Sequence, residues 1–489
     1  MSVSDLQRDF SSALRLQLTQ NWIEAECAYR RLIERAPNEP VLPYNLGLVL
    51  KAKGQFRESA EAFRAALRLN PSFPEAANNL GTTLTALGEL DEAIQILDTC
   101  TRAHPHFAEA FNNLGDAQKD RGEIESAVLA LQRAVQLQPD NPAFLSNLIY
   151  ALHYHPESTP ASLRAIAETW GQRFNASATA PASVATATGR KRIGYIGAFF
   201  RVHCQSLFLV PLLSHHHRDR YEIFCYSDDR RSDAVTSRLR GYSDHWQNIA
   251  GKSTTEIAAM ISADQLDMLI DLGLHTAQNY LPVFALRPAP RQVSWLGYPG
   301  TTGLAAMSER LSDPFLDPPG EHDGDYTETT LRLPHTFWCY DPIALTGNSI
   351  PLGHRSDETP ITLGCLNNFC KVNDQVLALW RRVLDAIPNS RFVLMAPRGS
   401  ARTRVREQLG LNENHIEFFE FAPRDRYLER YQSIDLCLDT YPYNGHTTSL
   451  DALWMGVPVV TLCGKTAVSR AGYSLLANLD LTELVAHNT

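Results

Sequence analysis

The chain has 489 residues, of which 44% are hydrophobic and 20% charged, and its formal net charge is −9. This length predicts more than one domain, because single hydrophobic cores stop growing at about 250–300 residues. The acidic balance argues against a nucleic-acid-binding protein, which would carry an excess of Lys and Arg. Nine cysteines without a C-x-x-C pair indicate reduced thiols. With no signal peptide and no run of about 18 apolar residues, we predict a cytoplasmic protein without membrane contact.

Residues recur every 34 positions through the first third of the chain. This period resembles the tetratricopeptide repeat and predicts a superhelix of helix pairs. Glycines would lie in the turns, small residues where two helices approach, and prolines between units. The recurring positions are Pro37, Pro71, Pro105 and Pro139; Gly54, Gly88 and Gly122; Ala25, Ser59, Ala93 and Ala127; and Tyr29, Phe63, Leu97 and Leu131.

An asparagine column follows the same period, at Asn45, Asn79, Asn113 and Asn147. In one interpretation each amide caps or bridges within its own repeat. In the other the amides form a ladder along the concave groove, where each can donate to and accept from an extended peptide backbone. The residues alone leave both interpretations open.

Beyond the repeats, one more helix is expected up to residue 174, and an Ala/Ser/Thr-rich stretch at 175–189 is typical of a linker. Short β-rich runs such as "RIGYIGAF", "YEIFCYS", "LDMLIDLGL" and "RQVSWLGY" then alternate with helical periods. The pattern restarts with "ITLGCLN", "RFVLMA", "IEFFEF", "DLCLD" and "VPVVTLC". Such alternation predicts two parallel, doubly wound sheets. We therefore expect a repeat domain at 1–174, an N-terminal lobe at 190–355 and a C-terminal lobe at 356–489.

One polar cluster stands at the start of a helix, in "NGHTTSLDALW". A buried strand, a glycine-containing turn and a helix that begins on hydroxyls can hold a phosphate, because the free N–H groups face the anion. The alternative is that Thr448 caps the helix, with Asp451 closing a capping box. The chain has neither a G-x-G-x-x-G fingerprint nor a P-loop, which argues against dinucleotide enzymes and P-loop NTPases.

Three segments together carry a family resemblance: "RPAPRQVSWLGYPGTTG", "LNNFCKV" and "CLDTYPYNGHTTSLDALWMGVPVVTL". They resemble the catalytic region of the protein O-linked N-acetylglucosamine transferases and their SPINDLY-type relatives, over roughly residues 190 to 489. The resemblance implies a GT-B fold with two Rossmann-like lobes, and inversion at the anomeric carbon with no metal and no cofactor besides the sugar donor. The absence of a long insert between the lobes favours a bacterial form.

The resemblance also implies a nucleotide-sugar site. Lys371 would neutralise the leaving diphosphate, and Asp451 would bind the ribose. The other implied donor-site residues are His446, Thr447 and Thr448 at the diphosphate; Asn368, an amide where animal enzymes have Gln; Ala422 and Arg424 at the base and ribose; and Tyr427, where animal members stack a His on the base.

Two histidines would lie at the reacting centre. His203 aligns with a histidine proposed as general base, and the alternative is that it positions the acceptor. His275, in "DLGLHT", matches the G-H-T of SPINDLY-type members and is expected to face the sugar. Phe199 stands where the family has Asp, which could weaken activity. The chain also ends at "LTELVAHNT", where relatives continue with further helices.

The resemblance implies a protein O-glycosyltransferase that moves GlcNAc from UDP-GlcNAc to Ser or Thr of polypeptides held by the repeat groove. The alternatives are a GDP-fucose- or UDP-glucose-dependent transferase, and a catalytically weak scaffold that binds peptides. Adjacent histidines in "SHHH" and the acidic pair in "YSDD" lack metal-ligand spacing, so no metal site is expected. The sequence indicates neither the acceptor proteins nor the oligomeric state.

Overall fold

The computed structural model describes residues 3–175, 189–343 and 360–489, which fall into two compact units. One unit comprises residues 1–139 with 397–404, and the other comprises residues 140–396 with 405–489. Most of the predicted linker at 175–189 lies outside the described residues, and so does the predicted lobe boundary at 355/356.

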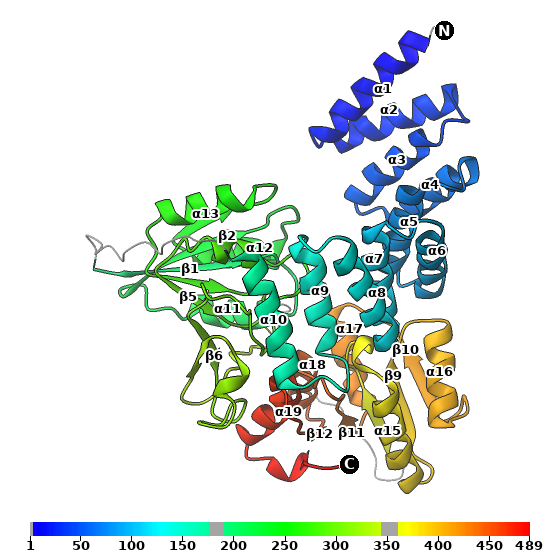
Figure 1. Ribbon diagram of the computed structural model, residues 1–489. Coiled ribbons are helices and arrows are strands. Elements are labelled where there is room, and N and C mark those ends of the chain that lie inside the picture. The colour runs from blue at the N-terminus through cyan, green and yellow to red at the C-terminus, as the bar shows by residue number, and fades with distance from the viewer. Residues whose placement is uncertain (1–2, 176–188, 344–359) are drawn as a thin grey trace. The chain divides into compact units, whose positions relative to one another are not determined.

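The first unit consists largely of paired helices (Figure 1). Its turn glycines, Gly54, Gly88 and Gly122, have φ of 77°, 77° and 80°, a conformation that favours glycine. The helices are α1 (Val3–Leu18), α2 (Trp22–Arg35), α3 (Val41–Ala52), α4 (Phe56–Leu69), α5 (Pro74–Leu87), α6 (Leu90–Ala103), α7 (Ala108–Asp120) and α8 (Ile124–Leu137). The predicted helix pairs and their turns are confirmed.

A second glycine column lets the helices of each pair approach closely. A Cβ added to Gly47, Gly81 or Gly115 would lie 2.6, 2.4 or 2.6 Å from the side chain of Phe63, Leu97 or Leu131, respectively. These large side chains, like the small residues of the Ala25 column, are fully buried. The 34-residue repeat therefore reflects packing: in each unit, one large side chain fills the space that one glycine leaves.

We expect Gly81→Ala to destabilise the repeat unit by about 1–3 kcal/mol, because the new methyl group would overlap Leu97. Thermal unfolding of the full chain, followed by circular dichroism, measures this. Gly241→Ala is the control, since Gly241 lies in helix α12 (Ala234–Tyr242) with nothing within 4 Å of an added Cβ. Equal melting temperatures for Gly81→Ala and Gly241→Ala would contradict the packing argument.

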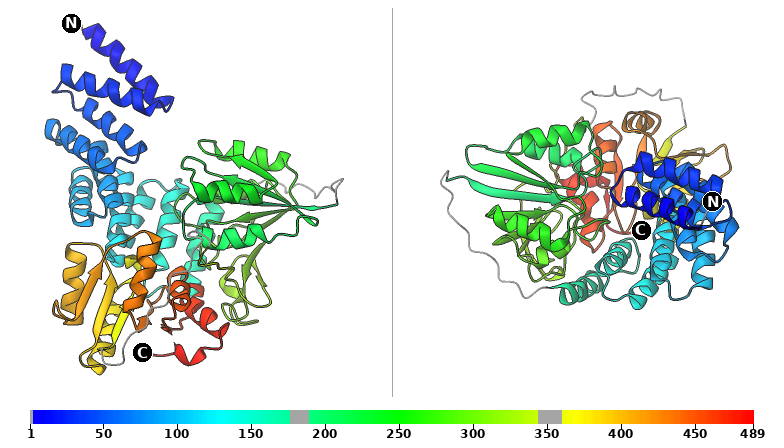
Figure 2. Two further views of the ribbon diagram at one scale, coloured as in Figure 1. Left: turned by 180° about the vertical axis from the view of Figure 1, so that it is seen from behind. Right: turned by 90° about the horizontal axis from the view of Figure 1, so that it is seen from above.

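The second unit begins with α9 (Pro142–Leu152) and α10 (Pro160–Phe174) and continues into the N-terminal lobe. In the described residues, this lobe has a seven-stranded parallel sheet with the order β3-β2-β1-β4-β5-β6-β7. The lobe is drawn mainly in green in both views of Figure 2. Its elements are β1 (Lys191–Gly197), α11 (Ser206–Ser214), β2 (Tyr221–Ser227), α12, β3 (His245–Asn248), α13 (Thr254–Ala263), β4 (Met268–Asp271), α14 (Leu281–Ala285), β5 (Arg291–Ser294), β6 (Glu309–Ser312), a 3₁₀ turn (Asp323–Asp325) and β7 (Thr329–Arg332).

The C-terminal lobe has a second parallel sheet, with six strands in the described residues and the order β10-β9-β8-β11-β12-β13. Two doubly wound lobes confirm the predicted fold class. The elements are β8 (Thr362–Cys365), η2 (Phe369–Lys371), α15 (Asp374–Ala386), β9 (Arg391–Met395), α16 (Ser400–Leu409), β10 (Ile416–Phe419), α17 (Arg424–Glu429), η3 (Arg430–Ser433), β11 (Leu436–Leu438), α18 (Thr447–Trp454), β12 (Val459–Leu462), α19 (Ala467–Ala477), η4 (Thr482–Leu484) and β13 (Val485–Ala486).

Two of the predicted strands turn several residues before their β-rich runs end. In the segments "LDMLIDLGL" and "RQVSWLGY", β4 ends at Asp271 and β5 ends at Ser294. The Asp271 carboxylate accepts hydrogen bonds from the N–H groups of Gly273 and Leu274 and so turns the chain. Positive φ at Leu274 (49°) and Leu296 (79°) breaks both extended runs. These turns place His275 and the loop after β5 beside α9 and α10.

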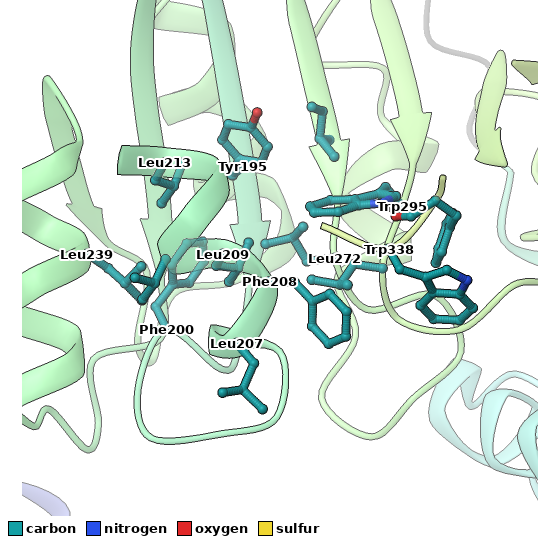
Figure 3. Close-up of a cluster of buried hydrophobic side chains, with 14 of the residues drawn as sticks. Tyr195, Phe200, Leu207, Phe208, Leu209, Leu213, Leu239, Leu272, Trp295 and Trp338 are labelled. Carbon is teal, nitrogen blue, oxygen red and sulfur yellow. Dashed lines mark hydrogen bonds between the residues drawn. The ribbon is translucent and has the colours of Figure 1, made fainter. Parts of the chain in front are cut away.

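A hydrophobic core joins the N-terminal sheet to α11 and to the segment after β7 that carries Trp338 (Figure 3). Phe208 and Leu209 of α11 pack with Tyr195 of β1, and Trp295 and Trp338 extend the cluster. The C-terminal helix α19 contributes Ala471 and Leu475 to the same cluster. Helix α19 therefore packs on the N-terminal lobe, although its strand β12 belongs to the other sheet.

Buried polar contacts reinforce this crossing of α19. Arg470 Nη2 lies 2.6 Å from Asp317 Oδ1, and Arg310 Nη1 lies 2.6 Å from Asp317 Oδ2. Asp317 has no exposed surface, and the two guanidinium groups hold the pKa of its carboxyl well below its usual value. Because a buried charge needs a partner, this pairing fixes where α19 meets the N-terminal lobe.

Candidate functional site

Two strand ends of the C-terminal lobe build the candidate site. Lys371 lies in the 3₁₀ turn after β8, and the turn 439–446 follows the neighbouring strand β11. Since β8 and β11 are parallel, their carboxyl ends meet at one edge of the sheet. Helix α18 begins at the same edge, at Thr447.

A buried amide and a buried carboxylate shape this turn. Asn367 Nδ2 donates to Asp439 Oδ1 (3.1 Å) and to Thr440 Oγ1 (2.8 Å), while the Thr448 hydroxyl donates to Asn367 Oδ1. Asp439 also accepts from the Gly445 N–H at 2.6 Å. Asn368, which the resemblance places in the donor site, is exposed here, whereas its neighbour Asn367 is 4% exposed. The signal for Asn367 was its position two residues after the buried strand β8.

Helix α18 starts without a side-chain cap. Its N-cap residue is His446, which makes no capping hydrogen bond, and Thr448 already lies inside the helix. The alternative interpretation, in which Thr448 caps the helix with Asp451 in a capping box, is therefore wrong. The side chain of Thr448 therefore caps none of the first N–H groups of α18. An anion site at a helix start requires N–H groups without such a cap.

Lys371 is held by a carbonyl group and an aromatic ring instead of an ion pair. Its Nζ donates to the carbonyl of Asn444 at 2.6 Å and lies 4.2 Å from the centroid of the Tyr443 ring. Lys371 forms no ion pair within the described ranges of the chain. Burial lowers the pKa of its ammonium from 10.5 to about 8. The arrangement leaves a positive charge beside the start of α18.

His446 is kept neutral in the same place. Its ring lies 5.1 Å from Trp338 and 4.9 Å from Tyr443, measured between ring centroids. Burial and the nearby Lys371 hold the pKa of the imidazole well below its usual value. Its Nε2 is buried and has no hydrogen-bond partner in the part of the chain that the structure describes. A neutral imidazole can offer either a donor or an acceptor there, according to its tautomer.

The predicted ribose ligand Asp451 is 1% exposed and already engaged. Arg424 reaches both of its oxygens, with Nη2 2.6 Å from Oδ1 and Nη1 3.2 Å from Oδ2. The hydroxyl of Tyr340 also donates to Oδ1. The sequence analysis missed Tyr340, because it stands outside every motif. Arg424 is therefore neutralised by Asp451, whereas Lys371 is not neutralised.

The expected base-binding residues lie next to this pair. Ala422 is partly buried just before α17, and Tyr427 lies within α17. The Tyr427 hydroxyl is 2.7 Å from that of Tyr431, which donates to the carbonyl of Thr448 at 2.9 Å. This chain of hydrogen bonds connects α17 to α18. Contact of Ala422 and Tyr427 with a base stays a prediction.

His203 lies on a loop of the N-terminal lobe, stacked on Phe199. The ring centroids are 4.1 Å apart and the planes differ by 13°. His203 Nδ1 accepts from the Gln205 N–H at 3.2 Å. Burial, assisted by the charge of Arg201, lowers the pKa of His203 to about 4. The imidazole is neutral at pH 7, and Phe199 orients it by stacking.

His275 is fully buried between helices α9 and α10 and the loop after β5. Its Nε2 lies 3.0 Å from the carbonyl of Thr302, so Nε2 carries the hydrogen and Nδ1 accepts from Ser146 Oγ, also at 3.0 Å. Trp170 of α10 packs edge-on against it at 5.4 Å. Burial lowers the pKa of His275 to about 3. Both ring nitrogens have protein partners, and its contact with a sugar stays a prediction.

The asparagine column is divided between the two units, with Asn147 in the second. The amides of Asn45 and Asn79 donate to Val41 O (2.8 Å) and Glu75 O (2.9 Å) of their own helices. Asn113 Nδ2 donates to Asn78 Oδ1 of the preceding repeat at 2.8 Å. These bonds use amide hydrogens within and between repeats, and peptide binding by the column stays a prediction.

No group of three or more His, Cys, Asp or Glu side chains is placed to hold a metal ion in residues 3–175, 189–343 and 360–489. Among the helices of these residues, none has the length and apolar character needed to cross a membrane.

Comparison with known families gives matches along the chain. The model of glycosyl transferase family 41 matches residues 174–346 and 354–489, and tetratricopeptide repeat models match residues 44–106 and 108–141. The chain is 34% identical over 368 residues to the "probable UDP-N-acetylglucosamine–peptide N-acetylglucosaminyltransferase SPINDLY" of Solanum lycopersicum, and 35% identical over 367 residues to that of Arabidopsis thaliana. These alignments cover 72% of this chain but only 39% and 40% of the relatives, so the chain spans about two fifths of their length.

A solved structure matches nearly the whole chain. A variant of Thermobaculum terrenum O-GlcNAc transferase superimposes with a TM-score of 0.84 and is 34% identical. The match covers 92% of this chain and 87% of that one. The helical repeats and the two lobes therefore occur together in that protein as well.

We expect Asn367→Ala to lower the free energy of unfolding by about 1–3 kcal/mol, because Asp439 and the Thr448 hydroxyl would each lose a buried partner. The matched control is Asn368→Ala, which removes an exposed amide one residue later. Urea unfolding of both variants, followed by tryptophan fluorescence, compares them. Equal stability of the two variants would show that the amide of Asn367 does not hold the turn.

Proposed function

The chain belongs to glycosyl transferase family 41, and we propose that it transfers GlcNAc from UDP-GlcNAc to Ser or Thr of polypeptides with inversion. One observation carries the proposal: the ammonium of Lys371, which has no ion-pair partner in the described residues, lies beside the uncapped start of α18. A nucleotide sugar leaves behind a diphosphate whose bridging oxygen gains negative charge as the sugar departs. Fixed positive charge in a dry site stabilises such a charge far more than water does.

The proposed reaction uses residues of both lobes. The acceptor hydroxyl oxygen forms a bond to the anomeric carbon, the bond from that carbon to the diphosphate breaks, and its electron pair stays on the diphosphate. Attack from the face opposite the leaving group inverts the configuration. The hydroxyl proton passes to Nδ1 of neutral His203, which is the nitrogen with the available electron pair because it accepts a hydrogen bond from the Gln205 N–H.

The names of the relatives, which specify UDP-N-acetylglucosamine, support this donor. We assign the diphosphate to Lys371, His446, Thr447 and Thr448, and the nucleoside to Ala422, Arg424, Tyr427 and Asp451. The repeats, with their asparagine column, would hold the polypeptide acceptor, and the reaction would take place in the cytoplasm without a metal.

Phe199 supports the scaffold alternative, because it replaces a family aspartate beside His203.

The test is sugar transfer to unstructured peptides rich in Ser and Thr, with UDP-GlcNAc, UDP-glucose and GDP-fucose offered in parallel. We expect product from UDP-GlcNAc and a loss in kcat of about 10²-fold or more for Lys371→Ala. Lys465→Ala, which removes an exposed lysine of the same lobe, is the control and should transfer normally.

Each other outcome has a definite meaning. Transfer from GDP-fucose or UDP-glucose alone would replace the donor assignment. Retained binding of UDP without transfer from any donor would identify the peptide-binding scaffold. Full activity of Lys371→Ala would remove Lys371 from the proposed chemistry.

A further inference from the structure

A lysine that stabilises a leaving group must be fixed in place and still carry an available charge. A carboxylate partner would fix it but would also neutralise it. Lys371 has instead a carbonyl oxygen, from Asn444, and the face of the Tyr443 ring. An aromatic face attracts an ammonium through its quadrupole and leaves the net charge unchanged, and the attraction is stronger where water is excluded.

Tyr443 is itself held between two partners. It is 4% exposed, and its ring stacks on that of Tyr154 with centroids 4.8 Å apart and planes 12° apart. His446 lies at 4.9 Å from the same ring. The side chain that contacts Lys371 therefore has little freedom to move, because rings pack against it from two directions.

The stack continues into the helix pair that precedes the catalytic lobes. Tyr154 follows α9 by two residues and is 2% exposed. Tyr150 of α9 packs against Tyr154 at 5.2 Å and against Tyr298, in the loop after β5, at 5.3 Å. Helix α9 thus contacts both lobes through one group of aromatic rings, all of which belong to the same compact unit.

We propose that Tyr443 positions the Lys371 ammonium for the leaving diphosphate, and that Tyr154 holds Tyr443 in place, so that the last helix pair forms part of the donor site. This inference rests on the proposed function for the role of Lys371. Tyr443 and Tyr154 are positioning residues, which act on the reaction through Lys371.

The rings have a second effect, because they keep water from the ammonium. Burial is the main cause that lowers the pKa of Lys371 to about 8. The other titratable groups that face Lys371 are Cys370, Asp439, Cys365, Cys204 and His446, and the carboxyl and thiol groups among them act to raise its pKa. Removal of the ring wall would admit water and raise the pKa of Lys371 toward its usual 10.5.

The test is the titration of Lys371 in the full chain without any donor. The sequence contains seven lysines, so trace acetylation across a pH series, read by peptide mass spectrometry, gives one midpoint for each. We expect Tyr443→Leu to raise the Lys371 midpoint by about one unit, and Tyr154→Leu to raise it by less. Tyr443→Phe keeps the ring and should keep the wild-type midpoint. An unchanged midpoint in both leucine variants would overturn the proposal.

A matched control separates this effect from general loosening of the lobe. Phe392→Leu removes a fully buried ring that packs on Trp380, in the core of the same lobe. It should leave the Lys371 midpoint and kcat unchanged. A shift in Phe392→Leu as large as that in Tyr443→Leu would reduce the stack to a structural role and overturn the inference.

Turnover supplies the second measurement. With the donor that the transfer assay identifies, Tyr154→Leu should lower kcat about tenfold and change the KM for the donor less, because the charge is present but misplaced. An unchanged kcat in Tyr154→Leu would overturn the positioning role. If instead Lys371→Ala is fully active, the proposed function of Lys371 fails, whereas the titration still reports whether the rings hold the ammonium.

Discussion

The burial of one ammonium group without a counter-ion is the constraint on which the site depends. Water would solvate Lys371 far better than a carbonyl and a ring do, so the fold must supply the difference. It does so through the turn after β11, where Asn367 and Asp439 fix the backbone that presents the Asn444 carbonyl. The helix start at Thr447 then lies beside the same charge.

The surrounding groups leave Lys371 without an ion pair in the described residues, although the nearby carboxyl of Asp439 acts to raise its pKa. Burial depresses the pKa of His203, His275 and His446, so all three are neutral at pH 7. Arg424 is a cation, but Asp451 neutralises it. If the site binds a diphosphate as proposed, such an arrangement helps the product to leave, because each added cation would also strengthen the binding of the product.

The general architecture was accessible from the sequence because it depends on local periods. The 34-residue spacing and the alternation of strands and helices come from packing within a repeat or a βα unit. The same reasoning could not find Tyr340 or Tyr154, whose partners Asp451 and Tyr443 stand more than a hundred residues away. Nor could it show that Asn367, next to the predicted donor-site residue Asn368, is the buried one of the two, since adjacent identical residues differ only in which one faces the neighbouring strand end.

The close approach of α10 to the loop after β5 shows why the last helix pair belongs with the lobes. A Cβ added to Gly171 would lie 1.8 Å from Gly303 O, and one added to Gly303 would lie 1.9 Å from Ala167 O. Backbone thus packs directly on backbone, with no side chain between them that could adjust to a shift. Any displacement of α9 and α10 must therefore move the loop that carries Tyr298, together with the Tyr154 ring against Tyr443. Helices α9 and α10 are therefore joined to the surroundings of Lys371 through a rigid contact, and not through a flexible connection.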